Sequence, residues 1–377
     1  MDMQKKKILF FTPFSKRNGA EMMLWYLLEY ANKDKFQFAV YSLHSGELLS
    51  ELPDDVPYFT PPASVTIPLY KRITNKLLRK TSVSLTLEEH IQLVHADFKP
   101  DIWYINTILC PQVTRLANKI QFPYAVHFHE LLLLYQHTLY DDLKYSIIKA
   151  KFLLGCSQKV CDNLKMMGGQ NVLLQYECID IRKVEKYSSC NASIIKREDI
   201  GIKDNKFIWV MSGSVEYRKG TDLLPAIARA VSNDAVILWL GPGSSGYSYF
   251  IEQELAYNGI DNVIFLGAKS DDYYDYLALA DGMLLTSRED PFPLVMIEAA
   301  AMAKPIVSFN SGGIKEFIED GMGIVVESVD VSELVDAMYM VMKKEVYLDK
   351  GLAMRRASQF DARSQVQLWQ DSIESLL

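Results

Sequence analysis

Cysteine is scarce in this 377-residue sequence, and the spacing of its cysteines carries no metal or redox motif. No two of them form a C-x-x-C pair, which argues against a zinc ribbon and against a dithiol redox site. An odd number of cysteines in a chain of this size fits a reducing compartment better than a disulfide scaffold. The five are Cys110, Cys156, Cys161, Cys178 and Cys190.

Long apolar runs are also absent. A helix that spans a bilayer needs about 18 apolar residues, and no run in the sequence approaches that length. The basic start Met1–Lys7 and the apolar run Ile8–Phe11 together mimic a signal peptide, but Pro13 and the cations after it stop the run too early. We therefore expect a soluble, cytoplasmic protein.

Neither sign of charge is in large excess. Lys and Arg number 40 against 47 Asp and Glu, a net charge of −7. A protein dedicated to nucleic acid is usually basic, so we expect no nucleic-acid partner. The hydrophobic fraction of 49% and charged fraction of 23% are typical of a globular protein, and the length predicts two domains of about 150 residues or more.

Short apolar runs alternate with amphipathic stretches, which indicates an α/β fold with parallel sheets. A polar stretch at Glu177–Asn205 separates two such series. We therefore predict two doubly wound, Rossmann-like domains, residues 1–180 and 181–357, with the ligand in a cleft at the carboxyl ends of their strands. The expected strands are Ile8–Thr12, Phe36–Ser42, Ile102–Ile105, Tyr124–Phe128 and Phe152–Cys156, then Phe207–Met211, Ala235–Leu240, Val263–Leu266, Gly282–Thr286, Pro305–Phe309 and Gly323–Val326, with a helix over Glu21–Ala31.

The most informative stretch runs from Ser287 to Ala300. A predicted strand ends just before it, and Pro293 suits the first turn of a helix. The free N–H groups of that helix, near Leu294 and Val295, form an anion site for a diphosphate. Glu298, about one turn further on, can accept hydrogen bonds from both hydroxyls of a ribose.

This stretch resembles the E-x7-E signature of the family-4 retaining glycosyltransferases, which have the GT-B fold. Asp290 stands where the family has its first Glu, Pro293 stands where it has Gly, and Glu298 matches the second Glu. The resemblance implies that Asp290 contacts the donor sugar and Glu298 the ribose. Asp is one methylene shorter than Glu, and the alternative is a proline-rich loop that caps an ordinary helix.

Two further segments of the second domain resemble the same family. The stretch from Gly213 to Gly220 is similar to its G-R-x-x-x-x-K-G loop, in which Lys219 matches the lysine that neutralises the donor diphosphate. Ser214 replaces the family arginine, and Arg218 can restore that charge, which a leaving diphosphate needs. The alternative is a solvated turn. Ser311–Glu316 resembles a G-G-x-x-E turn, where Gly312 and Gly313 let backbone approach the donor; a plain turn is nearly as good an interpretation.

In the first domain, Asn18–Glu21 resembles the family's G-G-A-E loop, which implies that Gly19 and Ala20 face the donor diphosphate or the acceptor. His129 matches the family histidine beside the reacting sugar, where it would stabilise positive charge at the anomeric carbon. We prefer it to His127, which we expect to point to the opposite side: the two share a face by alternation only if the strand continues through both, and we expect it to end between them. No third ligand is identifiable near this pair, so we expect no metal.

Other segments depart from the family or stay open. Glu177-Cys178 stands where the resembled interdomain segment usually reads Asn-Gly. Gly241–Gly246 spells G-x-G-x-x-G, but it follows the second strand rather than the first, so we interpret it as an ordinary loop. Leu69–Lys80 resembles a basic amphipathic helix that rests on anionic lipid, although a solvated helix packed on its own core is slightly favoured. By resemblance, the helix at residues 358–377 crosses back onto the first domain.

Together these segments predict a retaining glycosyltransferase of GT-B fold, active in polysaccharide biosynthesis. It would move a sugar from a nucleoside-diphosphate sugar, a substrate rather than a cofactor, to a glycan or lipid-linked acceptor, with peripheral contact at the inner membrane face as a further option. Two alternatives stay open: a catalytically silent GT-B-like partner subunit, which the departures from the family pattern favour, and a sugar-nucleotide epimerase, which His129 argues against.

Overall fold

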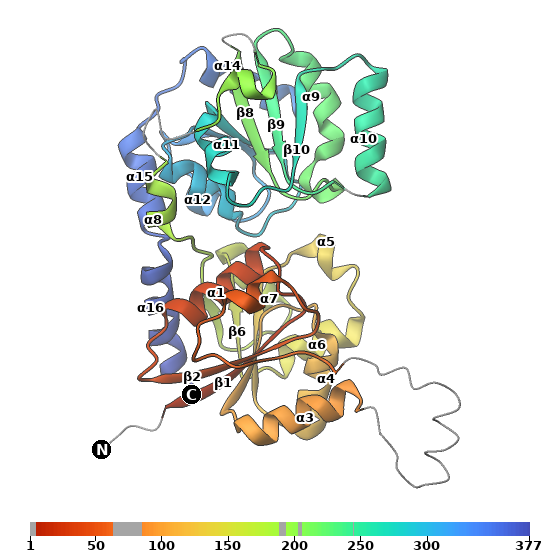
Figure 1. The fold of residues 1–377 in the computed structure, drawn as a ribbon, viewed down its shortest axis with the longest axis vertical. Helices are drawn as coiled ribbons and strands as arrows, with labels where there is room; N and C mark the ends of the chain where they lie inside the picture. The colour runs from red at the N-terminus through yellow and green to blue at the C-terminus, as the bar shows by residue number, and fades with distance from the viewer. Residues whose placement is uncertain (1–4, 63–84, 188–193, 203–205, 244) are drawn as a thin grey trace.

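The computed structural model describes residues 5–62, 85–187, 194–202, 206–243 and 245–377. They form two α/β domains stacked along the longest axis of the molecule, each built on its own parallel sheet (Figure 1). The basic segment Leu69–Lys80 and Cys190 lie outside the described residues. Within the described ranges, no helix has the length and apolar character needed to cross a membrane.

Seven parallel strands form the first sheet, in the order β3-β2-β1-β4-β5-β6-β7. In the register of the central strands, Leu9 pairs with Ala39 on one side and with Trp103 on the other. The longer strands are continuous apolar runs because helices bury both faces of a parallel sheet. The strands are β1 Lys6–Thr12, β2 Phe36–Ser42, β3 Tyr58–Phe59, β4 Ile102–Ile105, β5 Tyr124–Phe128, β6 Phe152–Gly155 and β7 Val172–Leu174.

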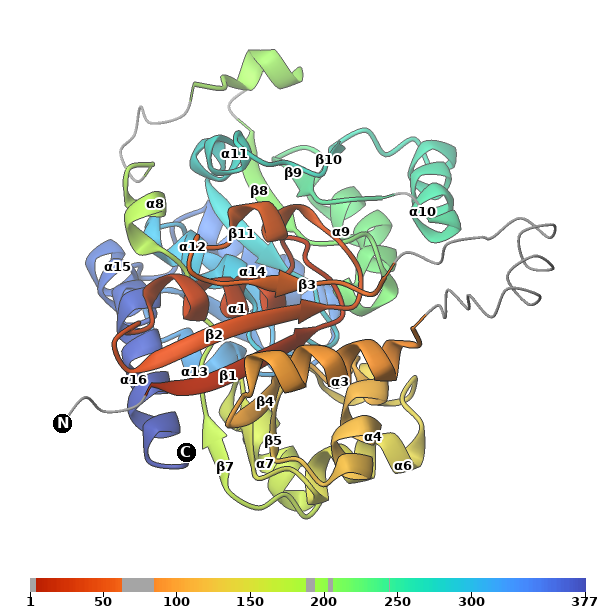
Figure 2. The ribbon, with the colours of Figure 1, turned by 60° about the horizontal axis from the view of Figure 1, so that its bottom comes forward.

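Helices cover both faces of this sheet, and successive residues of β1 divide between the two faces. Ile8 and Phe10 pack with α1 (Gly19–Tyr30) and α16 (Ala362–Glu374), whereas Leu9 and Phe11 pack with helices of the other face. Figure 2 accordingly shows α1 and α3 on opposite sides of β1. The remaining helices of this domain are η1 Glu47–Glu51, α3 Leu87–Phe98, α4 Pro111–Ile120, α5 Leu132–Tyr135, α6 Tyr140–Ile148 and α7 Gln158–Met166.

Six parallel strands form the second sheet, in the order β10-β9-β8-β11-β12-β13. Trp209 and Trp239 on its central strands are fully buried, as their place in predicted strands suggested. The strands are β8 Phe207–Ser212, β9 Ala235–Leu240, β10 Val263–Gly267, β11 Gly282–Leu285, β12 Ile306–Phe309 and β13 Gly323–Val326. The helices are α8 Ile181–Glu185, η2 Arg197–Ile200, η3 Tyr217–Lys219, η4 Thr221–Leu223, α9 Leu224–Ala230, α10 Gly246–Tyr257, α11 Tyr273–Leu279, α12 Leu294–Ala301, α13 Ile314–Phe317, α14 Val331–Met342 and α15 Lys350–Ser358.

The chain passes between the two domains twice, and the two passages touch. Ile179 and Asp361 form an isolated parallel bridge, in which the Ala362 N–H donates to the Ile179 carbonyl over 2.8 Å. Beyond this point α16 runs down beside the first domain (Figure 1) and packs against α1. Trp369 of α16 is fully buried among aromatic rings of the first sheet, including Phe10 and Tyr104.

The predicted fold class is confirmed: the chain forms two mixed α/β domains with parallel, doubly wound sheets. Every predicted strand is present to within a residue or two. Two short edge strands were not predicted. Strand β3 has only two residues, and β7 has three.

Candidate active site

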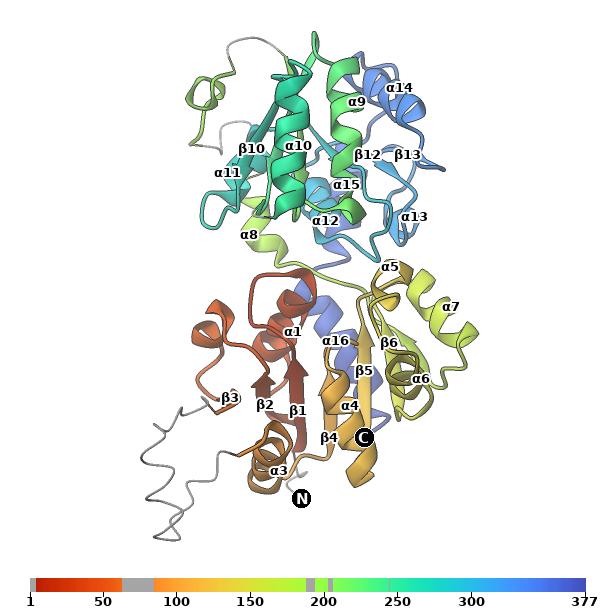
Figure 3. The same cartoon turned by 90° about the vertical axis from the view of Figure 1, so that its right-hand side faces the viewer.

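The carboxyl ends of the first sheet face the second domain. In Figure 3 the arrowheads of β1 and β5 point toward it. Ligands of open parallel sheets bind at this end of the strands. A site shared by the two domains can therefore be built from five loops. Two follow β1 and β5 of the first sheet, and three follow β8, β11 and β12 of the second. All the predicted site residues lie in or just beyond these loops.

The loop between β11 and α12 carries Asp290, and its carboxylate is held by a cation. Lys219 Nζ donates to Asp290 Oδ2 over 2.5 Å, and Ser287 Oγ lies 3.2 Å from the same oxygen. Both partners of the ion pair are largely buried, with side chains 16% and 9% exposed. The structure thus brings together Lys219 and Asp290, two residues singled out from separate motifs.

Two opposing effects set the pKa of Asp290. Burial alone would raise it, because the carboxylate loses hydration. The charges of Lys219 and then Arg218, together with the hydrogen bonds from Lys219 and Ser287, outweigh burial and hold the pKa below its usual value. Asp290 is therefore an ionised carboxylate inside the domain boundary, next to a cation that a phosphate could also bind.

Arg218 and Glu289 lie beside this pair and make different contacts. The Arg218 guanidinium donates to the Glu289 carbonyl over 2.9 Å and to the Glu216 carboxylate over 3.0 Å. The Glu289 side chain turns away, and its Oε1 accepts a hydrogen bond from the Leu133 N–H of the first domain over 2.8 Å. Glu289 is thus a contact between domains, and Asp290 is the acidic residue that faces Lys219.

Glu298 lies on α12 and is buried, with two tyrosines on its carboxylate. The Tyr273 hydroxyl is 2.8 Å from Oε2, and the Tyr274 hydroxyl donates to Oε1 over 3.1 Å. Burial raises the pKa of Glu298, and the two hydrogen bonds oppose that shift. Neither tyrosine was among the predicted site residues. They open α11, and nothing in the sequence around them marks them as site residues.

The glycines after β12 fit closely against the acidic loop. A Cβ on Gly312, whose φ is +150°, would lie 2.2 Å from the Asp290 carbonyl oxygen, and one on Gly313 would lie 2.4 Å from that of Pro291. Gly312 also pairs with Asp290 in an isolated bridge. These contacts explain why side chains are excluded here. We expected the backbone of Gly312 and Gly313 to approach the donor. In the structure it approaches the loop that carries Asp290.

The start of α1 meets the start of α12 across the domain boundary. A Cβ on Gly19 would be 3.9 Å from the Leu294 side chain, and the Asn106 amide donates to the Ala20 carbonyl over 2.8 Å. The N–H groups of Leu294 and Val295 have no acceptor within their own helix, as in the first turn of any helix. The starts of α1 and α12, whose backbone we predicted to lie at the donor diphosphate, thus face one another.

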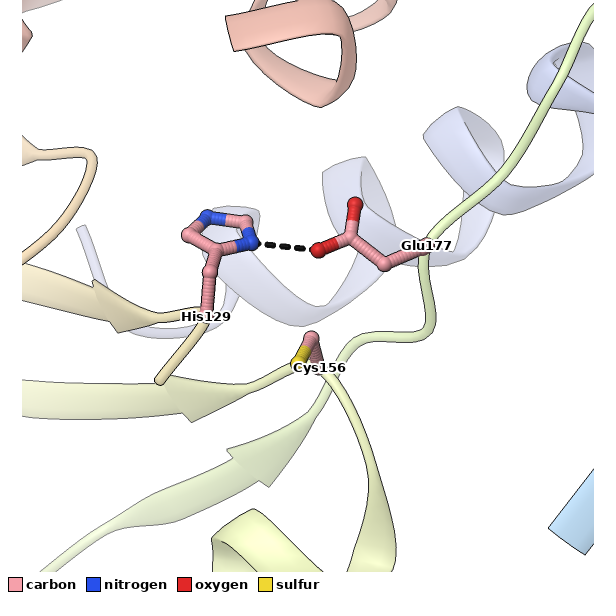
Figure 4. Close-up of side chains that lie close together, drawn as sticks. All are labelled: His129, Cys156 and Glu177. Atoms are coloured by element: carbon pink, nitrogen blue, oxygen red, sulfur yellow. Dashed lines mark hydrogen bonds and ion pairs between the residues drawn. The ribbon is translucent and has the colours of Figure 1, made fainter. Parts of the chain in front are cut away.

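His129 follows β5 directly, and its ring contacts Glu177. Nδ1 of His129 is hydrogen-bonded to Oε1 of Glu177, and both side chains are buried, at 6% and 5% exposure. Figure 4 shows the two groups facing one another above Cys156. Burial lowers the pKa of His129 to about 3 and raises that of Glu177, so the ring is a neutral imidazole at physiological pH. Sequence reasoning treated Glu177 only as a departure from the family pattern.

His127 lies on the same side as His129, which corrects the expectation of opposite sides. Strand β5 ends at Phe128, and the two ring centroids are 4.0 Å apart, so the alternation that puts residues two apart on one face carries past the end of the strand. His127 is fully buried, and its Nδ1 lies 3.0 Å from the Tyr104 hydroxyl. It is a core histidine that packs against the predicted one.

With the geometry in place, the chain can be compared with known proteins. Residues 193–359 match the family described as glycosyl transferases group 1. The match falls on the second domain. Two curated relatives are similar to this group 1 domain: N-acetyl-alpha-D-glucosaminyl L-malate synthase of Bacillus anthracis, 30% identical over 152 residues, and alpha-galactosylglucosyldiacylglycerol synthase of Streptococcus pneumoniae, 35% identical over 117 residues. The matches cover 40% and 29% of this chain, and only 39% and 30% of the relatives.

Solved structures extend the likeness to both domains of the chain. The Anabaena protein HepE, in complex with UDP and glucose, superposes with a TM-score of 0.76 at 21% identity, covering 98% of this chain and all of that one. The lipopolysaccharide outer core galactosyltransferase WaaB superposes with a TM-score of 0.69 at 14% identity, over 99% of this chain and 100% of its own. The fold is GT-B.

Within the described part of the chain, one group of side chains has the composition of a metal site. Potential ligand atoms of His129, Cys156 and Glu177 lie within 4.8 Å of one another. However, Nδ1 of His129 is already bonded to Glu177, and burial raises the pKa of the Cys156 thiol, which keeps it protonated. The arrangement is that of a hydrogen-bonded His–Glu pair above a thiol.

The remaining predicted residue, Ser214, is exposed in the loop after β8. It follows Gly213, whose carbonyl accepts a hydrogen bond from the Trp239 indole over 2.8 Å. The loop at Gly241 packs against this same backbone, since a Cβ on Gly241 would lie 1.9 Å from the Gly213 carbonyl oxygen. The G-x-G-x-x-G stretch therefore begins as a packing contact between neighbouring loops.

Proposed function

We propose that this protein is a retaining, metal-independent hexosyltransferase that uses a nucleoside-diphosphate sugar as donor and a glycan or lipid-linked molecule as acceptor. The observation that supports it most is the buried Lys219–Asp290 ion pair, which lies beside Arg218 in the loops at the domain boundary. A bound diphosphate requires cations in that position, and a donor sugar requires polar groups close to them.

In this proposal the donor lies along the second domain. Arg218 and Lys219 neutralise the diphosphate, the first N–H groups of α12 at Leu294 and Val295 add their partial positive charge, and Glu298 binds the ribose hydroxyls. One ammonium carries three N–H donors, so Lys219 can hold Asp290 and a phosphate oxygen together. Asp290 then contacts the sugar from the side of the diphosphate.

Transfer breaks the bond between the anomeric carbon and the phosphate oxygen. The acceptor hydroxyl attacks the same face, and the leaving phosphate takes its proton. The cations stabilise the charge that develops on the diphosphate, an effect that is large in a site from which water is excluded. His129 stabilises the sugar as positive charge builds at its anomeric carbon.

The relatives support the donor class and leave a choice of acceptors. HepE was solved with UDP and with UDP-glucose, and the curated relatives carry names that indicate sugar transfer to malate in one case and to a diacylglycerol glycolipid in the other. We infer a nucleotide-sugar donor for this chain. We place the acceptor among glycans and lipid-linked molecules.

A ligand screen followed by a donor assay tests the proposal. We expect UDP, GDP or ADP and a matching sugar nucleotide to raise the melting temperature. We also expect slow donor hydrolysis in EDTA, and an NMR spectrum of the transfer product that shows the donor's anomeric configuration. Asp290→Asn should abolish turnover, whereas Lys206→Ala, on a lysine that donates to the Ser232 carbonyl, should not. Nucleotide binding without any turnover would favour a silent partner subunit, and inversion or EDTA sensitivity would contradict the proposed chemistry.

A further inference from the structure

We propose that Glu177 is a positioning residue for His129: it binds the ring through Nδ1 and leaves Nε2 as the ring atom that meets the donor sugar. The inference deepens the proposed function and rests on it. Glu177 lies between β7 and α8, on the passage toward the second domain, whereas His129 follows β5. The pair therefore joins the end of a central strand to the interdomain connection.

The contact is direct and shielded. Oε1 of Glu177 is hydrogen-bonded to Nδ1 of His129, and less than a tenth of either side chain is exposed. In Figure 4 the carboxylate approaches the edge of the ring, with Cys156 beneath them. Water has little access to such a pair, so the hydrogen bond is not exchanged for solvent and the ring cannot rotate freely about its χ2 torsion.

A second contact restrains the His129 ring. The ring of His127 packs against the ring of His129, with 4.0 Å between their centroids. His127 is in turn hydrogen-bonded to the Tyr104 hydroxyl. That hydroxyl lies 3.3 Å from the indole nitrogen of Trp369 on α16. Glu177 and His127 thus restrain His129 from two directions, and the restraint is anchored in the core of the first domain.

Two atoms of the pair have no hydrogen-bond partner. Among the described residues, the buried Nε2 of His129 and Oε2 of Glu177 are both without one. Buried polar atoms of native proteins are almost always paired, so these two indicate a partner that is a ligand. Because Nδ1 is taken by Glu177, Nε2 is the only ring nitrogen left for it. Asp290, the residue proposed to contact the sugar, lies near enough for its charge to raise the pKa of Glu177 further.

Glu177 also accounts for a departure from the family pattern. The resembled segment usually has Asn at this position, one methylene shorter and uncharged. The longer side chain of Glu177 reaches the ring of His129. The replacement of Asn by Glu therefore adds a contact to His129, the residue that we propose meets the sugar.

The experiment that tests this without requiring turnover is nitrogen NMR of the histidine rings. The chain has six histidines, and the spectrum of His129→Gln assigns the signals of His129 by their loss. We expect Glu177→Gln and Glu177→Ala to shift both ring nitrogens of His129, and Glu198→Gln, at an exposed carboxylate, to shift neither. Unchanged His129 signals in both Glu177 variants would overturn the proposal, whether or not the protein transfers sugar.

Kinetics then separate an indirect role from a direct one. We expect Glu177→Ala to lower kcat at least tenfold with the donor KM changed less than twofold, and Glu177→Gln to recover part of the loss because its amide can still hydrogen-bond to Nδ1. In the His129→Gln background, Glu177→Ala should cost no more than twofold. A full additional loss in that background would mean that Glu177 acts on the substrate itself and would overturn its assignment as a positioning residue. If the wild type shows no turnover, the proposed function fails and the NMR result still decides the contact.

Discussion

The ammonium group of Lys219 contacts a carboxylate of the protein itself, although its proposed ligand is a diphosphate. Its 2.5 Å contact with Asp290 lies where neither charge is well hydrated. A buried cation without a partner is strongly destabilising, so Asp290 keeps the site stable when no donor is bound. In the proposed function, the same ammonium group adds a contact to the donor phosphate when the donor binds.

The first prediction concerns this lysine. Lys219→Ala should weaken nucleoside-diphosphate binding about tenfold or more, because a hydrogen bond to a charged group contributes about 1.5–3 kcal/mol. Lys219→Arg keeps the charge and should lose less. Calorimetric titration measures both, with Lys206→Ala as the control. Unchanged affinity in Lys219→Ala would remove this residue from the binding site.

A second prediction follows from Glu21, a buried carboxyl near the start of α1 that lines a small cavity with Trp25 and Leu48. Burial raises its pKa to about 7. The folded state then holds a proton that the unfolded chain releases near pH 4.5, so this group's contribution to stability is full below pH 4.5 and declines as the pH rises through 7.

Glu21→Gln removes that dependence. Relative to the wild type it should be more stable by up to about 3 kcal/mol at pH 8, at 1.36 kcal/mol per pH unit, with no gain at pH 4. Urea unfolding across this pH range measures the difference. Glu29→Gln, at an exposed position on the same helix, should leave the curve unchanged. A gain that is equal at both pH values would show that folding leaves the pKa of Glu21 unchanged.

At the scale of elements, two carboxylates of the second domain contact the beginnings of helices in the first. Glu316 of α13 accepts hydrogen bonds from the N–H groups of Gln158 and Lys159 at the start of α7, over 2.7 and 3.0 Å. Glu289 does the same at Leu133 in α5. Anions are stabilised at helix N-termini, so both contacts favour the observed arrangement of the domains.

Glu316→Gln tests the larger of these contacts. Replacing a charged acceptor at a helix start costs about 1 kcal/mol, which should shift the ratio of separated to contacting domains about fivefold. Energy transfer between dyes on the two domains should fall, and kcat with it, while the melting temperature stays close to that of the wild type. Glu327→Gln, an exposed carboxylate paired only within the second domain, serves as the control. Unchanged energy transfer would show that Glu316 does not hold the domains together.

Elements and motifs were predictable from the sequence to different degrees. Most strands could be predicted, because fully buried strands are unbroken apolar runs. Strands β3 and β7 could not, because they are too short to show a pattern. The Lys219 and Asp290 motifs were visible because each is local. The partners of Glu298 and His129 were not predicted, since Tyr273 and Tyr274 come from α11 and Glu177 from the segment between β7 and α8, and nothing in their own neighbourhoods marks them. His127 was misplaced because we expected the end of the strand to separate it from His129, whereas the two rings keep the common side that period-2 spacing gives.

At the scale of the whole molecule, the net charge of −7 does not decide whether the protein approaches a membrane. Surface attraction is local, and each Lys or Arg near anionic lipid contributes about 1 kcal/mol within a Debye length. The segment Leu69–Lys80 holds five cations, enough to exceed repulsion from distant carboxylates. We propose it as the contact to the membrane that a lipid-linked acceptor would require.

Vesicle sedimentation tests this proposal. The wild type should pellet with anionic vesicles and not with neutral ones, and high salt should release it. Changing Lys71, Arg72, Lys76, Arg79 and Lys80 to Gln should abolish pelleting and spare donor hydrolysis. A wild type that stays in the supernatant with anionic vesicles at low salt would mean that the acceptor is reached in solution.

The bridge between Ile179 and Asp361 also constrains how the two domains can move. Both connections between the domains pass through this one place, which therefore acts as a pivot. A change in the angle between the domains is then a rotation about the pivot rather than a sliding motion. Displacement then grows with distance from the pivot, as along a lever arm. Labels beside Ile179 would report almost no change, and labels on the loops furthest from it would report the full swing.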